Sequence, residues 1–174
     1  MDKADLAARV KQAAYLEGDF VLRSGKRSKY YLDKYLFSAQ PDILAELGRC
    51  FAAKAEAVGN VDVIAGPELG AVALAAATSM AGGIPFAIVR KAQKGYGTDK
   101  LVEGAPVAGK RVLLVEDIGT TAGAALQAAE TLKAAGAVVV GLVFAIDRME
   151  GAREAVEAAG FAFDAILNKQ DLGI

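Results

Sequence analysis

Short apolar segments alternate with alanine-rich segments from residue 61 to the end of the chain. The apolar segments predict β-strands, because each is too short for a helix of typical length; they are 61–65, 85–89, 111–115, 137–146 and 163–167. The alanine-rich segments predict helices that begin near Gly70, Gly123 and Gly151. This alternation predicts an α/β fold with a mostly parallel sheet that helices cover on both faces.

The first 60 residues have a different pattern. Apolar residues at helical spacing predict a helix over 3–16, and β-rich segments at 20–22 and 30–37 predict a hairpin with a basic tip at 23–29. Pro41 predicts the first turn of another helix, which ends near Gly59. Residues 1–174 are therefore expected to form one domain, in which 1–40 are a small N-terminal appendage.

Composition removes several classes of function. The chain has 174 residues, a formal net charge of −1, one cysteine and no histidine. The absence of histidine excludes imidazole catalysis and His-containing metal sites, and a single cysteine excludes an internal disulfide. Cys50 lies on an apolar helical face and is expected to be a buried structural thiol rather than a nucleophile.

The charge pattern also bears on partners and location. Balanced charge argues against broad nucleic-acid binding, because neutralising phosphates requires a basic face. No apolar stretch approaches the roughly 18 residues that indicate a membrane span. Asp2, Lys3 and Asp5 stand where a secretory signal has an apolar segment, so a cytoplasmic location is expected.

The candidate chemistry lies at the ends of the predicted strands. Ligands of open parallel sheets bind beyond the carboxyl ends of the strands, here the loops after Ala65, Val89, Val115 and Ile146. The third of these loops carries Glu116 and Asp117, followed by a Gly/Thr turn that opens a helix. Backbone N–H groups at such a turn can surround a phosphate, and the carboxylates can accept hydrogen bonds from sugar hydroxyls or bind Mg²⁺. The alternative is an acidic strand end with a threonine cap.

Residues 112–124, VLLVEDIGTTAGA, resemble the phosphoribosyl pyrophosphate signature of the type I phosphoribosyltransferases. Residues 20–33, FVLRSGKRSKYYLD, are similar to the base-binding hairpin of the members that act on orotate. Residues 90–97, RKAQKGYG, are similar to their mobile catalytic loop, and Asp147-Arg148 also matches. The resemblance covers about residues 18–150. It implies a type I phosphoribosyltransferase fold in which residues 1–40 form a hood over the base.

The resemblance further implies an activity and its partners. The chain would be a pentosyltransferase that joins orotate to phosphoribosyl pyrophosphate, giving orotidine monophosphate and pyrophosphate in pyrimidine nucleotide synthesis. Mg²⁺ would arrive with the substrate, with Asp117 as the candidate protein ligand. The active form would be a homodimer with shared sites, in which Lys94 reaches the site of the neighbouring subunit.

Residue roles carried over from the resemblance fall into two groups, with Lys94 and Asp117 as the catalytic pair. The phosphoribosyl pyrophosphate group consists of Arg90, Lys91, Lys94, Tyr96, Glu116, Asp117, Ile118, Gly119, Thr120, Thr121, Ala122, Gly123 and Ala124. The orotate group consists of Arg23, Tyr31, Leu32, Thr120 and Arg148. Tyr30 and Tyr31 could instead pack within the hairpin. Because side chains alternate along a strand, only one of the two would face the site.

The chain departs from the family pattern at several places. The acidic pair is Glu-Asp instead of Asp-Asp, and residues 122–124 contain no Ser or Thr. Tyr96 stands where many members carry histidine, so a phenol would replace the imidazole. Residues 66–70, GPELG, lack the lysine that some members carry, which leaves the backbone N–H groups for the pyrophosphate.

Two rival functions remain. A purine phosphoribosyltransferase would share the phosphate turn but lack the basic hairpin and Arg148. A nucleotide-sensing protein would keep the turn but need no cations in the segment 91–105, which is expected to be a mobile lid. The common alternative for such a segment is a solvated loop.

Overall fold

A six-stranded sheet forms the centre of the computed structural model, which describes residues 1–21, 25, 27–92 and 100–174. The strand order is β5-β4-β3-β6-β7-β8, with β5 antiparallel to β4 and the other neighbours parallel. The strands are β3 (Val63–Pro67), β4 (Phe86–Val89), β5 (Val102–Gly104), β6 (Arg111–Gly119), β7 (Val138–Asp147) and β8 (Phe163–Asn168). The predicted α/β class with a mostly parallel sheet is confirmed.

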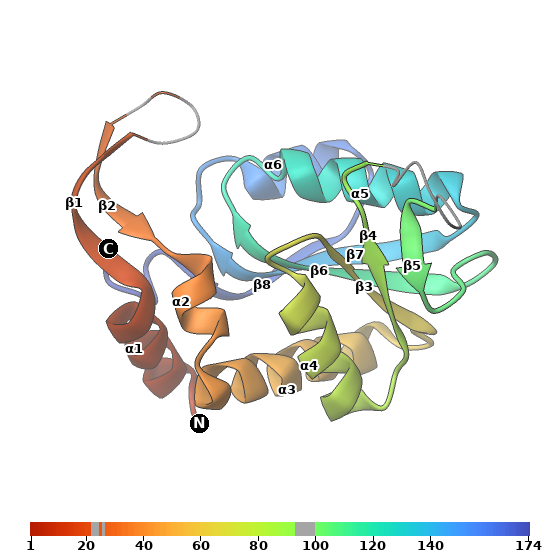
Figure 1. Cartoon of the computed structure of the whole chain (residues 1–174), viewed down its shortest axis with the longest axis horizontal. Coiled ribbons are helices and arrows are strands. Elements are labelled where there is room, and N and C mark those ends of the chain that lie inside the picture. Colours follow the sequence, from red (N-terminus) through yellow and green to blue (C-terminus); the bar gives the residue numbers. More distant parts are fainter. Residues whose placement is uncertain (22–24, 26, 93–99) are drawn as a thin grey trace.

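Helices cover both faces of this sheet (Figure 1). One face carries α1 (Lys3–Ala14), α3 (Pro41–Val58) and α4 (Val72–Gly82), and the other carries α5 (Gly123–Ala134) and α6 (Ala152–Ala158). The side chains of successive β6 residues pack alternately on the two faces of the sheet. Leu113 and Val115 pack in the cluster with α1, α3 and α4, whereas Val112 and Leu114 pack with α5 and α6. The continuous apolar run in the sequence thus reflects a strand that is buried on both sides.

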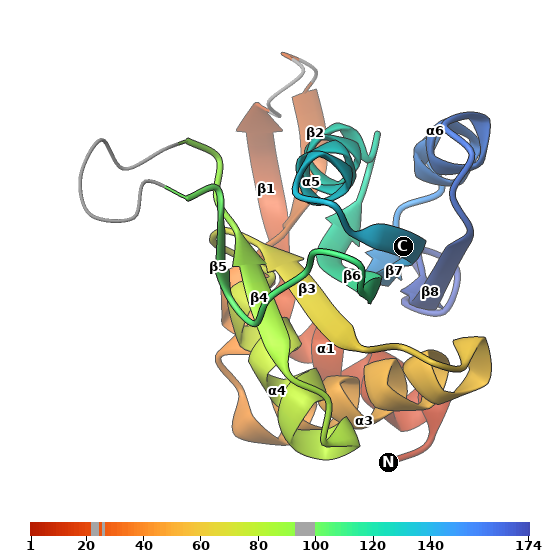
Figure 2. The same cartoon turned by 90° about the vertical axis from the view of Figure 1, so that its right-hand side faces the viewer.

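The hood consists of α1, the hairpin β1 (Tyr15–Val21) and β2 (Arg27–Leu32), and the short helix α2 (Lys34–Ser38). Seen in Figures 1 and 2, the hairpin extends away from the sheet beside the ends of the central strands. The side chains of Leu6 and Val10 join the core cluster that contains Leu47 and Leu113, so α1 packs into the same core as the sheet.

Three predicted elements are wrong in part, and one strand was missed. The first hairpin strand runs from Tyr15 to Val21 instead of over 20–22. The expected strand over 30–37 ends at Leu32, because Asp33 accepts a hydrogen bond from the Tyr35 N–H at 2.9 Å and caps α2. The first helix stops at Ala14 instead of residue 16, since Tyr15 already pairs with Leu32 in the hairpin. The sequence analysis also missed β5, a three-residue edge strand with no periodicity that pairing with β4 stabilises.

The strand β6 is longer than predicted and includes both acidic residues. It runs to Gly119 because its ladder with β7 continues through the pair Gly119 and Asp147. The carboxyl ends of β3, β4, β6 and β7 therefore meet at one edge of the sheet, next to the hood. Within the described ranges, no helix is long and apolar enough to cross a membrane.

Candidate active site

Glu116 and Asp117 form a buried acidic pair near the carboxyl end of β6. Their exposed fractions are 8% and 4%. Glu116 Oε1 accepts a hydrogen bond from the Asp117 N–H at 2.9 Å, and Asp117 Oδ1 accepts one from the Ile118 N–H at 2.6 Å. Backbone donors therefore fix one oxygen of each carboxylate, and the other oxygens remain for different partners.

Burial changes the protonation of Glu116. Desolvation, followed by the neighbouring Asp117 charge, raises the pKa of Glu116 from 4.5 to about 8. Lys34 and Lys91 act in the opposite direction. Glu116 is therefore largely protonated at neutral pH, when it can donate a hydrogen bond as well as accept one.

The turn after β6 leads into α5 with little side-chain bulk. Ala122 adopts a left-handed conformation, with φ of 57° and ψ of 10°, and gives α5 no side-chain cap. Thr121, Gly123 and Ala124 are exposed and Thr120 is half-buried. The first N–H groups of a helix lack partners within it, so an uncapped N-terminus beside two hydroxyls is suited to an anion such as phosphate.

Loop 66–70 leads from the end of β3 into α4 and lies beside the end of β4, where the Glu68 N–H donates to the Val89 carbonyl at 2.8 Å. Glu68 Oε1 accepts a hydrogen bond from the Lys91 N–H at 2.6 Å, and Glu68 Oε2 lies 3.9 Å from Arg90 Nη1. The Glu68–Leu69 peptide bond is cis. The two predicted pyrophosphate cations Arg90 and Lys91 are thus tied to this loop, a contact that the sequence analysis did not anticipate.

Arg148 follows β7 at the same edge, with 9% of its surface exposed. Its Nη2 donates to the Tyr30 hydroxyl at 3.1 Å and lies 3.0 Å from Glu150 Oε1. Its guanidinium also lies over the Tyr30 ring, 5.2 Å from the centroid. In the part of the chain that the structure describes, the buried Nε has no hydrogen-bond partner, which leaves a donor for an anionic ligand.

The hood residues differ in their relation to Arg148. Tyr30, which the sequence analysis left open, contacts it directly, whereas Tyr31 is 40% exposed and packs on Phe20 at 5.7 Å between ring centroids. Leu32 is buried in the core beneath the hood. Lys34 is the hood residue that sequence reasoning missed, because the sequence does not reveal which hood side chains face the sheet.

Several predicted residues are not tested by these contacts. Arg23, Lys94 and Tyr96 lie outside the described residues, as do positions 93–99 of the expected lid.

Cys50 is partly buried at the edge of the core instead of fully buried. Burial raises the pKa of its thiol, which is consistent with an unreactive cysteine.

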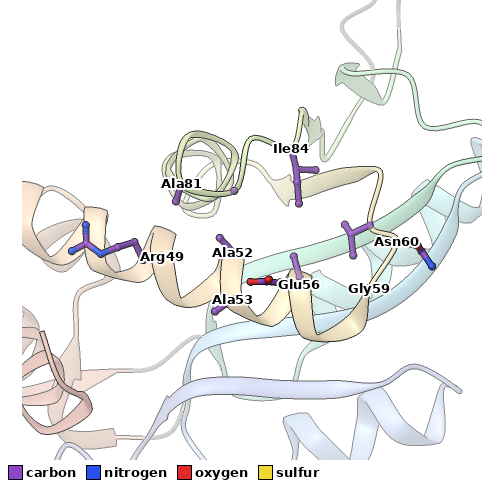
Figure 3. Close-up of a pocket in the computed structure, with 11 residues that line it drawn as sticks. Arg49, Ala52, Ala53, Glu56, Gly59, Asn60, Ala81 and Ile84 are labelled. Atoms are coloured by element: carbon purple, nitrogen blue, oxygen red, sulfur yellow. The ribbon is translucent and has the colours of Figure 1, made fainter.

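A hollow of about 650 Å³ lies away from the strand ends described above, between the ends of α3 and α4 and the start of β3 (Figure 3). Its lining consists mostly of alanine, glycine and aliphatic residues, together with Arg49, Glu56 and Asn60. Arg49 already pairs with Glu46 on the same helix. The hollow therefore lacks the converging polar groups that the β6 edge supplies.

The described residues contain no group of three or more His, Cys, Asp or Glu side chains that could hold a metal ion. Glu116 and Asp117 supply hard oxygen ligands at the β6 edge, and Mg²⁺ commonly takes one or two carboxylates together with substrate phosphates and water. The donor chemistry fits a magnesium ion that arrives with a phosphorylated substrate.

The family model of the phosphoribosyl transferase domain matches residues 37–173. The orotate phosphoribosyltransferase of Methanocella arvoryzae is 42% identical over 169 residues, which cover 97% of this chain and 95% of that protein. The Pyrococcus furiosus orotate phosphoribosyltransferase is 47% identical, covering 83% of this chain and 80% of that protein.

A solved structure agrees with these relatives. The Mycobacterium tuberculosis orotate phosphoribosyltransferase in complex with phosphoribosyl pyrophosphate superposes with a TM-score of 0.86 at 35% identity, covering all of both chains. The chain belongs to the phosphoribosyltransferase family and, within it, to the orotate phosphoribosyltransferases.

Proposed function

We infer that this chain transfers the ribosyl phosphate group of phosphoribosyl pyrophosphate to orotate, releasing pyrophosphate and giving orotidine monophosphate. The observation that carries this inference is the meeting of two sites at one sheet edge. A sugar-phosphate site lies at Glu116, Asp117 and the turn before α5, and a cationic site for a base lies at Arg148. The reaction makes the protein a pentosyltransferase of pyrimidine nucleotide synthesis.

We assign phosphoribosyl pyrophosphate to the β6 edge. Glu116 and Asp117 bind the ribose hydroxyls, and residues 118–124 surround the ribose phosphate with backbone N–H groups and the Thr120 and Thr121 hydroxyls. The pyrophosphate is assigned to Arg90, Lys91, Lys94 and Tyr96. Support comes from the place of Arg90 and Lys91 at the end of β4, beside loop 66–70.

Orotate is assigned to the space between the hood and β7. The Arg148 guanidinium binds the orotate carboxylate, for which its unpartnered Nε supplies one donor. Arg23, Tyr31, Leu32 and Thr120 are placed near the ring by the resemblance. An uncharged purine offers no anion to the unpartnered Nε of the buried Arg148, so the site favours an acidic base.

The reaction needs positioning and charge more than proton transfer. The bond from ribose C1 to pyrophosphate breaks as the orotate ring nitrogen attacks, through a transition state with oxocarbenium character, and the proton of that nitrogen is released to solvent or to the departing pyrophosphate. Negative charge builds on the leaving pyrophosphate, so fixed cations stabilise the transition state more than the bound substrate. Orotate is already an anion, which explains how the chain functions without histidine.

We also propose the setting in which this happens. Asp117 is the protein ligand for a magnesium ion carried by phosphoribosyl pyrophosphate, and that ion, when bound, offsets charge on the pyrophosphate. Residues 1–174 act as one domain, in a cytoplasmic homodimer in which Lys94 completes the neighbouring site. Light scattering tests the dimer, and a fully active monomer would contradict shared sites.

The activity is tested by following orotate absorbance with purified protein, phosphoribosyl pyrophosphate and magnesium. Parallel reactions contain uracil, adenine, hypoxanthine or guanine. We expect turnover of orotate alone. Turnover of a purine would contradict the assignment of Arg148, and binding of phosphoribosyl pyrophosphate without turnover of any base would favour a sensor.

A further inference from the structure

Lys34 is a hood residue that contacts the acidic pair. It is the first residue of α2, and its Nζ lies 3.0 Å from Asp117 Oδ2. The Asp117 side chain is only 5% exposed, whereas that of Lys34 is 36% exposed. The ion pair therefore joins a buried carboxylate of β6 to a cation supplied by the hood.

The surrounding backbone fixes this pair from two sides. The Asp33 cap holds the start of α2, so the backbone of Lys34 has a defined position. A Cβ atom on Gly70 would lie 1.9 Å from Asp117 Oδ2 and 3.1 Å from the Lys34 Cδ and Cε atoms. The lysine stem and the carboxylate thus meet over a glycine of loop 66–70.

The pair also balances charge where an anionic substrate must bind. Phosphoribosyl pyrophosphate carries several negative charges, and an unpaired carboxylate in a buried site would both repel it and be costly to desolvate. Lys34 neutralises Asp117, and the structure shows Asp117 Oδ1 already held by the Ile118 N–H. Each carboxylate oxygen has two acceptor positions, so Oδ2 can bind Lys34 and a ribose hydroxyl together.

We propose that Lys34 is a positioning residue for phosphoribosyl pyrophosphate, which acts by holding Asp117 and offsetting its charge. This role rests on the proposed function of the acidic pair in binding ribose. A lysine that merely filled the empty site would have to be displaced by substrate, so its removal would strengthen binding. The two roles therefore differ in the sign of one measurable change.

The test compares Lys34→Met, which keeps the stem and removes the charge, with Lys34→Gln and Lys34→Arg. Lys54→Met is the matched control, because Lys54 has the same 36% side-chain exposure and pairs with Asp164 at 2.7 Å. Titration calorimetry with phosphoribosyl pyrophosphate and magnesium, without base, gives Kd. Steady-state assays give KM for each substrate, and thermal unfolding shows whether each variant is folded.

We expect Lys34→Met and Lys34→Gln to raise Kd and KM for phosphoribosyl pyrophosphate by about tenfold, the scale of losing one close charge pair. The KM for orotate should change by less than about twofold, because Lys34 does not act on the base site. Lys34→Arg should recover part of the loss, and Lys54→Met should bind as the wild type does. Unchanged or tighter binding in the two neutral variants would overturn the proposal.

A double variant separates action through Asp117 from direct contact with substrate. If Lys34 acts through Asp117, adding Lys34→Met to Asp117→Asn should weaken binding by much less than Lys34→Met does alone. Additive losses would overturn the positioning role. A wild-type protein that binds phosphoribosyl pyrophosphate but leaves orotate unchanged would instead contradict the proposed function, while the effect of Lys34 on binding would still be measured.

Discussion

Replacing Gly70 with alanine is expected to damage the sugar site without damaging the backbone. Gly70 is buried in loop 66–70 and lacks the positive φ that would itself strain an alanine. The added methyl group would stand 1.9 Å from Asp117 Oδ2 and 3.1 Å from the Lys34 stem. The conflict is therefore with the acidic pair and its lysine.

The size of the effect follows from that distance. Ordinary van der Waals contact begins at 3.4 Å, so the carboxylate oxygen or the loop must retreat by about 1.5 Å. A shift of that size breaks the Lys34 ion pair or the hydrogen bond from the Ile118 N–H. Misplacement of a binding group by about 1 Å can reduce rates about 100-fold, which corresponds to about 2.7 kcal/mol.

The assay measures kcat/KM for phosphoribosyl pyrophosphate at saturating orotate, alongside thermal unfolding. Gly141→Ala on β7 is the matched control, because Gly141 is also buried and without positive φ, but the atoms nearest to an added Cβ, on Ala162 and Leu113, are 3.5 Å away. We expect a loss of about 100-fold for Gly70→Ala and little change for Gly141→Ala. A folded Gly70→Ala protein with normal kcat/KM would refute the packing of Asp117 against this loop.

Glu116→Gln is expected to flatten the dependence of stability on pH. The folded protein holds the Glu116 proton up to about pH 8, whereas the unfolded chain loses it near 4.5, so the wild-type free energy of unfolding should fall as pH rises across this window, by up to about 1.4 kcal/mol per pH unit. Urea unfolding from pH 5 to 8 measures both proteins, and parallel curves would contradict the raised pKa. Tyr30→Phe removes the hydroxyl that holds Arg148 and should raise the KM for orotate by about two- to tenfold, with the KM for phosphoribosyl pyrophosphate as the internal control. Lys94→Ala should lower turnover by about 2.7–4 kcal/mol with the fold intact, and a near-normal rate would remove Lys94 from the mechanism.

The sheet was predictable because burial on both faces leaves a strong signal. The apolar run of β6 identifies a central strand, since Val112 and Leu114 pack against one layer of helices while Leu113 and Val115 pack against the other. No comparable signal marks β5, whose three residues gain their conformation from pairing with β4. The run over 30–37 was misassigned because Asp33 ends the strand by capping α2, a local competition that β propensity does not reveal.

The site was predictable where its residues are adjacent in sequence. Glu116, Asp117 and the turn that follows form one motif, so their chemistry can be inferred before the fold is known. The contacts from Lys34 to Asp117 and from Tyr30 to Arg148 join residues more than 80 positions apart. Such contacts depend on how the hood docks against the sheet, which neither periodicity nor charge pattern specifies.

These two long-range contacts give the hood a role beyond covering the base. Tyr30 and Lys34 lie on either side of the Asp33 cap, one at the end of β2 and the other at the start of α2. Tyr30 contacts Arg148 beside the proposed base site, and Lys34 contacts Asp117 in the proposed sugar site. A rigid connection between them would couple the two subsites, because a shift of the hood that moves Tyr30 also moves Lys34. Perturbing the cap with Asp33→Ala should therefore affect both substrates, whereas Tyr30→Phe and Lys34→Met should each affect one.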